Sequence, residues 1–163
     1  MSSNPPNYRE LYFEHKLLKR INGEPNFFSL HYLLIELKAN AGSVPTTLGG
    51  GAHGFIGMII SPATYFTIAP NTPFIISVHP GTLTHVQGAT HFQIQAATTT
   101  YNEQLITFHS YQLVQRALVQ HVLEAMDAKY LSALRNRITG QVPSDIRSLI
   151  LPLFRIYGKI TPQ

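Results

Sequence analysis

The stretch LGGGAHGFIGMIISPATYFTI, residues 48–68, joins a run of glycines to an apolar segment and then to a helix start. Glycine adopts backbone conformations with positive φ that other residues avoid. The glycines at 49–51 therefore predict a sharp or mobile turn, and Gly54 and Gly57 carry the same freedom into the apolar segment 55–60. We expect this segment to be buried.

A short helix is expected directly after the apolar segment. Ser61 is a typical N-cap residue, and Pro62 suits the first helical position because its missing N–H would have no helical partner there. Pro70 marks the end of this helix. The stretch therefore reads as a glycine turn, a buried segment and one short helix.

The same stretch lies in a long segment without formal charge. Residues 39–102 contain no Asp, Glu, Lys or Arg, and the whole chain is only 12% charged, about half the usual share. A surface with few charges is poorly protected against association. We therefore expect the chain to associate with itself.

Helices are predicted on both sides of the uncharged segment. Ser29 is the expected N-cap of a helix that ends near residues 40–42, and Leu30, Leu33, Leu37 and Ala41 follow the spacing of one helical face. Between residues 70 and 88 the chain is rich in Pro, Thr and Gly, and we expect an extended loop packed by its own apolar residues.

The longest predicted helix covers about residues 90–126, with Leu105, Phe108, Tyr111 and Val122 in one apolar sector. Because threonine is a poor helix-interior residue, the run at 98–100 predicts either a kink or a helix that begins only near Asn102. Apolar residues on a second side place this helix at the centre of a bundle.

Two further helices complete the predicted fold. Asp127 is the expected cap of a short helix over 128–136, and Ser144 of a last helix whose apolar stripe runs to Tyr157. The predicted class is all-α, a bundle of five or six helices with a long Gly/Pro-rich loop excursion. With 163 residues, we expect one helical domain over 21–160, preceded by a tail or arm over 1–20. For residues 8–21 the pattern fits a short helix and an extended arm equally.

Composition excludes several classes. The chain has no cysteine, so it has no disulfide framework, thiolate zinc site or cysteine nucleophile. Its N-terminus lacks the apolar core of a signal peptide, and no stretch has the continuous apolarity of a membrane helix. We expect an intracellular, cytoplasmic protein without a membrane partner.

Positive charge is concentrated near the C-terminal end. Residues 128–160 hold six basic side chains against the single carboxylate of Asp145, a local net charge of +5. Such a region suits nucleic acid or an acidic partner, although a solvated helix face has the same composition. The candidate nucleic-acid contacts are Lys129, Arg135, Arg137, Arg147, Arg155 and Lys159.

No catalytic or metal constellation is apparent. Gly49, Gly51 and Gly54 fit G-x-G-x-x-G, but a dinucleotide site needs a preceding strand and an acidic residue about 20 positions later, and the first carboxylate is Glu103. No two histidines have the i, i+4 spacing of a helical metal site. We predict no catalytic residue, metal, cofactor or small-molecule substrate. We interpret His53 as a ring that bonds a nearby carbonyl and holds the loop.

A family resemblance rests on motifs in collinear order over about residues 20–161. The run GEPNFFSLHYLLIELKANAGSVPTTLGGGAHGFIGMIISPATYFTI, with the later AMDAKYLSALRNRITGQ and LFRIYGKIT, resembles the N-terminal Gag region of copia-type LTR retrotransposons. There, patterns such as L-G-G-G-x-H-G-H-L-G-L and Y-L-x-x-L-R-x-x-x-T-G recur. The matching positions are Gly49, Gly50, Gly51, His53, Gly54, Gly57, Tyr130, Leu131, Leu134, Arg135, Gly140, Tyr157 and Gly158.

The resemblance implies a capsid-like, non-enzymatic structural protein that assembles into virus-like particles and packages the RNA of its element. It makes 21–160 a Gag-like domain and implies structural roles for the matching positions. This sequence departs from the pattern at Phe55, where the family has a second histidine, and at Pro152. It also has no Cys-rich zinc knuckle and no protease or polymerase motif, so we expect a fragment, a truncated element or a copy retained by a host, with only weak RNA association.

Two other interpretations remain open. The first is a small basic nucleic-acid-binding or protein-interaction module reused by a host, which rests on the charge of residues 128–160. The second is a small enzyme or metalloprotein whose site is assembled from positions distant in the sequence.

Overall fold

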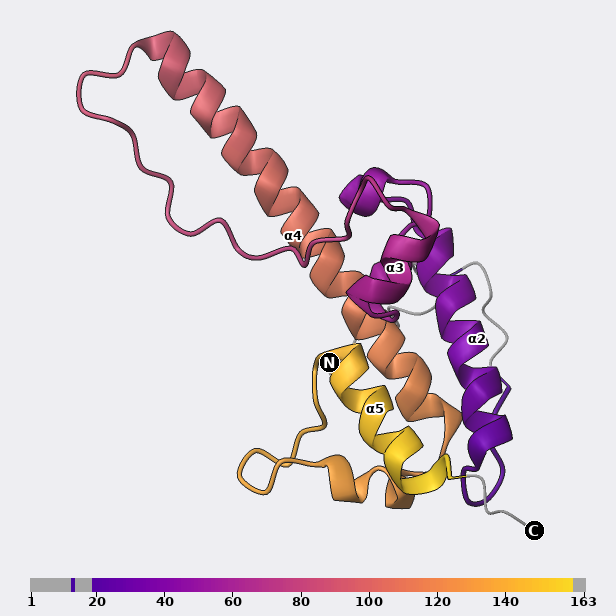
Figure 1. Ribbon diagram of the computed structural model, residues 1–163. Helices are drawn as coiled ribbons and strands as arrows, with labels where there is room; N and C mark the ends of the chain where they lie inside the picture. Colours follow the sequence, from indigo (N-terminus) through magenta and orange to yellow (C-terminus); the bar gives the residue numbers. More distant parts are fainter. Residues whose placement is uncertain (1–12, 14–18, 160–163) are drawn as a thin grey trace.

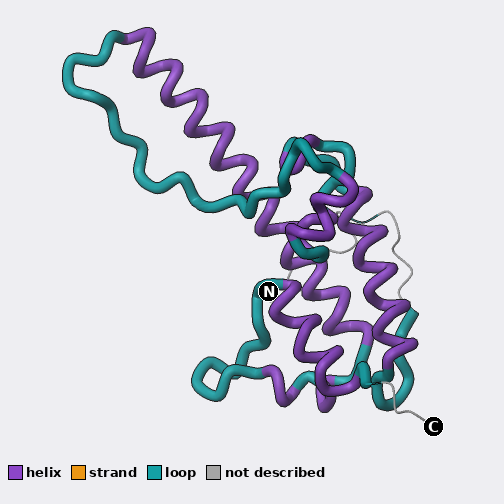
Figure 2. The backbone as a smooth tube through the Cα atoms, in the orientation of Figure 1, coloured by secondary structure: helices purple, strands orange, loops and turns teal. Residues whose placement is uncertain are grey.

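The computed structural model describes Phe13 and residues 19–159, and every regular element among them is helical. Figures 1 and 2 show the arrangement. The α-helices are α2 (Phe27–Ser43), α3 (Pro62–Ile68), α4 (His91–Ala125) and α5 (Ile146–Tyr157). Four short 3-10 helices are η1 (Leu48–Gly50), η2 (Ile56–Met58), η3 (Ala128–Tyr130) and η4 (Ser132–Leu134).

The all-α prediction is confirmed for these residues. The predicted number of five or six helices is not, because the described part holds four α-helices. The region 128–136, expected as one helix, forms two 3-10 turns instead. Of the predicted tail over 1–20, and of the helix or arm over 8–21, nearly all lies outside the described residues.

The bundle consists of α2, the second half of α4 and α5 (Figure 1). Its core takes Leu30, Leu33, Leu37 and Ala41 from α2, as their spacing predicts. From α4 come Val114, Ala117, Leu118, Val122 and Ala125, and from α5 Ile146, Leu149, Ile150 and Leu153. The buried segment predicted after the glycine turn is confirmed, since Phe55, Met58 and Ile59 complete this core.

Two predicted helix caps are wrong by a few residues. Asn26, rather than Ser29, is the N-cap of α2, and Ser29 at the third helical position completes a reciprocal capping box with it. Asn caps a helix as well as Ser does, so the sequence is compatible with a helix that begins after Asn26 or after Ser29. At α5 the cap is Asp145, whose carboxylate accepts from the Arg147 N–H, rather than Ser144.

Asp127 is the N-cap residue of η3, at the predicted position, but its side chain makes no cap hydrogen bond there. Its carboxylate instead pairs with the Arg20 guanidinium. This pair connects the beginning of the described chain to the end of α4.

Helix α3 begins as predicted. The Ser61 hydroxyl accepts a hydrogen bond from the Thr64 N–H at 3.2 Å, with Pro62 in the first turn. Helix α3 ends at Ile68, before Pro70.

Helix α4 is a single element that begins at His91, so the threonine run neither delays nor divides it. Thr90 and Gln93 form a capping box at its start. The hydroxyls of Thr98 and Thr99 donate to the carbonyls four residues earlier, which gives these polar groups partners within the helix.

Only the second half of α4 belongs to the bundle. Its buried residues begin at Tyr111, and the predicted apolar positions Leu105 and Phe108 lie before the core and stay partly exposed. The prediction that α4 is central along its length is therefore wrong for its first half.

The first half of α4 and the preceding loop form a projection that leaves the bundle (Figures 1 and 2). We call residues 69–108 the arm. The Tyr101 hydroxyl donates to the Gly81 carbonyl at 2.6 Å, and the rings of His79 and Phe108 lie 5.3 Å apart. These contacts hold the loop beside the helix.

The prediction that the loop of the arm is packed by its own apolar residues is wrong for most of them. Phe74 is an exception, because its ring packs against the core. Six large apolar side chains of the arm are at least 62% exposed, namely Ile75, Ile76, Val78, Val86, Phe92 and Ile106. Leu83, Ile94, Leu105 and Phe108 are half-buried.

Candidate functional site

The glycine turn adopts the backbone that its sequence predicts. Gly49, Gly50 and Gly51 have φ values of +62°, +83° and +81°. The buried Tyr65 hydroxyl of α3 donates a hydrogen bond to the Gly49 carbonyl at 2.7 Å. A Cβ at Gly49 would overlap this hydroxyl, so the glycine allows the phenol to reach the turn.

Gly54 and Gly57 permit two other close approaches. At Gly54, with φ of +55°, a Cβ would lie 2.5 Å from the Gly42 carbonyl oxygen at the end of α2. The following amide, of Phe55, donates to the Ala41 carbonyl at 2.8 Å. A Cβ at Gly57 would overlap the Phe74 ring. These glycines therefore join α2, η2 and the base of the arm.

His53 has no carbonyl partner for its ring among the described residues, so the predicted hydrogen bond is not found. The half-buried ring instead packs edge-on against Tyr65, with centroids 6.1 Å apart. The His53 carbonyl oxygen accepts from the Ile56 N–H. His53 thus supports the turn through its backbone and through ring packing.

A buried polar group that the sequence did not reveal lies between α2 and α4. His121 is fully buried, with Nδ1 3.3 Å from Asn40 Nδ2 and Nε2 3.2 Å from Glu36 Oε2. An amide nitrogen can only donate, so Nδ1 accepts and Nε2 carries the proton toward Glu36. Both ring nitrogens are engaged in holding the two helices together. The feature of the sequence that could have indicated this buried group is a polar residue, His121, within the apolar sector of α4.

The basic residues lie along the connection from η3 to the end of α5. Arg147 and Arg155 are separated by eight residues of α5, about 12 Å along its axis. The Lys129 ammonium lies 5.0 Å from the centre of the Tyr130 ring. Arg137, Arg155 and Lys159 are exposed.

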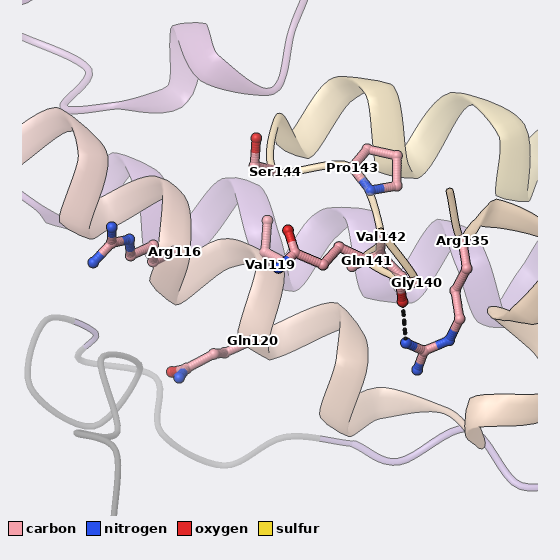
Figure 3. A pocket seen from close by; sticks show the side chains of 9 residues that line it. All are labelled: Arg116, Val119, Gln120, Arg135, Gly140, Gln141, Val142, Pro143 and Ser144. Atoms are coloured by element: carbon pink, nitrogen blue, oxygen red, sulfur yellow. Dashed lines mark hydrogen bonds between the residues drawn. The ribbon is translucent and has the colours of Figure 1, made fainter. Parts of the chain in front are cut away.

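A groove of about 390 Å³ adjoins this basic region (Figure 3). Its apolar part comes from Val119, Val142 and Pro143, and arginines lie at its two ends. The Arg135 guanidinium donates to the Gly140 carbonyl at 2.8 Å and so holds its own loop. The remaining lining residues are Arg116, Gln120, Gln141 and Ser144.

The described residues contain no group of three or more His, Cys, Asp or Glu placed to hold a metal ion. In the same part of the chain, no helix is long and apolar enough to cross a membrane.

The arm is a surface without an evident partner among the described residues. Glu103 is its only Asp, Glu, Lys or Arg residue. Its exposed isoleucine, valine and phenylalanine side chains lie on a projection that packs against little else (Figure 1). Exposed apolar surface of this kind marks interaction sites.

Comparison with protein families, curated proteins and solved structures finds no match to this chain.

Proposed function

We propose that this chain is a non-enzymatic, capsid-like structural protein that assembles with copies of itself inside the cell, as its resemblance to the Gag region of copia-type retrotransposons implies. The observation that carries the proposal is the arm, an almost uncharged projection with exposed apolar side chains. Association would bury these side chains.

The composition of the arm favours a like partner over a charged one. A nucleic acid or an anionic membrane would select basic side chains, and the arm has no Lys or Arg. Two arms that each carry a single carboxylate can meet with little repulsion. The bundle then serves as the rigid base, and the glycine turn joins α2 of the bundle to α3.

The test is light scattering coupled to size exclusion over a range of protein concentrations. Substituting Ile76→Asp, Val86→Asp and Phe92→Asp together adds three carboxylates to the arm at side chains that are 62%, 83% and 80% exposed. We expect the parent chain to form oligomers that grow with concentration and the triple variant to remain smaller at every concentration.

Ile138→Asp is the matched control, because Ile138 is 94% exposed and lies outside the arm. It should assemble like the parent chain. A parent chain that is monomeric throughout, or a triple variant that assembles as well as the parent, contradicts the proposal.

A second candidate function is weak RNA binding, either during assembly or by a basic module acting alone. It is favoured by the exposed cations Arg137, Arg155 and Lys159. Reversing all three to Glu should reduce RNA binding in a filter or anisotropy assay, and binding by the parent should fall steeply with salt. Unchanged oligomers in this variant would separate RNA binding from assembly, whereas unchanged RNA binding would remove the support for this function.

A further inference from the structure

Helix α2 has a second apolar face that the bundle leaves uncovered. Phe28, Tyr32 and Ile35 are 69%, 57% and 49% exposed, and Ala39 and Gly42 on the same face are also exposed. The spacing of these five residues is 4, 3, 4 and 3. At 100° per residue it confines them to a sector of about 80°. We call this set the α2 stripe.

The stripe lies opposite the face that builds the core, since Leu30, Leu33 and Leu37 fall on the other side of the helix. A helix that is apolar on two sides is normally covered on both. The alternating 4, 3 spacing is that of helices that pack side by side along a seam. The missing partner is therefore another helix.

The sizes of the side chains indicate which helix. The stripe begins with two large aromatic rings and ends with Ala39 and Gly42. If two copies of α2 pair antiparallel about a two-fold axis beside Ile35, Phe28 of each copy faces Gly42 of the other, and Tyr32 faces Ala39. The large end of one stripe then fills the small end of the other, and Ile35 meets Ile35.

We propose that the α2 stripe is a contact between two copies of this chain, with the helices antiparallel about Ile35. The inference rests on the proposed assembly function, to which it adds a second interface separate from the arm. Such a contact is isologous, because each residue i that touches j is matched by j touching i. A parallel pair would instead place Phe28 on Phe28 and leave a gap at Gly42.

Charge is compatible with this pairing. Among the described residues, Glu36 and Lys38 flank the stripe on opposite edges, and the Glu36 carboxylate is held 3.2 Å from the buried His121. Lys38 of one copy lies beside His31 of the other. The Lys19 ammonium lies over the Tyr32 ring, 5.1 Å from its centre. None of the five stripe residues is itself charged, so Lys19 brings the one charge that is described over a stripe ring.

The area predicts a weak contact. The three large side chains together expose on the order of 400 Å² per copy, about half of the ~800 Å² that each partner gives to a stable interface. Pairs should therefore form and dissociate with concentration, and gain strength only when the arm adds its own contacts.

Cysteine cross-linking tests the geometry, because the chain has no cysteine of its own. A disulfide needs Cα atoms about 4.4–6.8 Å apart. Under mild oxidation Ile35→Cys should give a covalent dimer at least tenfold faster than Ile138→Cys, a matched exposed isoleucine outside the stripe. Equal rates for the two variants overturn the proposal.

The orientation is tested with Phe28→Cys and Gly42→Cys. Each alone should cross-link slowly, and an equimolar mixture of the two should give a mixed dimer. Rapid self-linking of Phe28→Cys without the mixed dimer would show parallel helices and overturn the antiparallel contact.

A combined variant separates this contact from the arm. Ile35→Cys together with Ile76→Asp, Val86→Asp and Phe92→Asp should still cross-link, because the arm is not needed for the α2 pair. Loss of the cross-link overturns an independent interface.

A substitution at Gly42 tests the pairing itself. Gly42→Leu should slow the cross-linking of Ile35→Cys at least tenfold, because the leucine side chain would occupy the space that Phe28 of the other copy fills. A Cβ at Gly42 meets only the His53 carbonyl oxygen, at 3.6 Å, so folding should survive, as an unchanged melting temperature would show. Unchanged cross-linking in a folded Gly42→Leu variant counts against the contact.

Discussion

The two halves of α4 are one continuous helix held in two different ways. From Tyr111 onward the helix is fixed by the core of the bundle, whereas from His91 to Phe108 it is a side of the exposed arm. The first half relies on local devices, namely the capping box at Thr90 and threonine hydroxyls bonded to the preceding turn. The comparison separates residues that maintain the fold from residues that are free to serve association.

The comparison is tested most directly by shortening one apolar side chain in each half. Leu118 is fully buried, so Leu118→Ala should lower the free energy of unfolding by about 2–5 kcal/mol, through lost burial and the cavity left behind. Ile106 is 67% exposed, so Ile106→Ala should change it by no more than about 0.5 kcal/mol. Urea denaturation measures both. Similar losses would show that the arm is part of the cooperative core.

Two glycines sharpen the same comparison with a smaller effect. Gly54, beside the end of α2, and Gly88, in the arm, both have positive φ, at +55° and +81°. A Cβ at Gly54 would press on the Gly42 and Val44 carbonyl oxygens at 2.5 and 2.6 Å, whereas at Gly88 it would meet nothing within 4 Å. Gly54→Ala should therefore lower the free energy of unfolding by about 2–3 kcal/mol, because the Cβ clashes with the backbone in addition to the strain of a left-handed residue.

Gly88→Ala is the control for the strain alone. No atom clashes there and the loop can relax, so Gly88→Ala should lower the free energy of unfolding by about 1 kcal/mol, the lower end of the cost of a left-handed residue. Thermal or urea unfolding of the two variants gives the difference. An equal loss at both positions would mean that the contact of Gly54 with the end of α2 contributes nothing.

The helical class and the core of α2 could be predicted from the sequence because they depend on local spacing. Leu30, Leu33 and Leu37 repeat at helical intervals, and Ser61-Pro62 is a local start signal. The caps at Asn26 and Asp145 were missed by one to three residues, since neighbouring polar residues offered equivalent caps. In each case the residue that becomes the cap depends on which starting point lets the helix bury its apolar face.

The arm and the α2 stripe could not be predicted in this way. Periodicity shows that a helix has apolar faces but not which of them the rest of the chain covers. It therefore assigns Leu105 and Phe108 to a core that begins only at Tyr111. The pairing of His121 with Glu36 joins positions 85 residues apart, and nothing local connects them. The Phe28 and Tyr32 side of α2 could be recognised as free only after Leu30 and Leu33 were seen to face inward.

Tyr111, the first buried residue of α4, gives the smallest effect and tests where the core begins. Burial, with a further contribution from the nearby Asp145 carboxylate and opposed by Arg147, raises the pKa of the Tyr111 phenol above its ordinary value of 10.0. As pH rises past 10 the unfolded chain loses this proton first, so the unfolded state is favoured. The stability linked to Tyr111 should therefore be fully present below pH 10 and be lost as pH rises through the raised pKa. Tyr111→Phe removes that ionisation, so the stability of the parent relative to this variant, measured by urea denaturation from pH 8 to 11, should fall only above pH 10. A constant difference over this range would mean that the phenol is as accessible to water as in the unfolded chain, and that the core of α4 begins after residue 111.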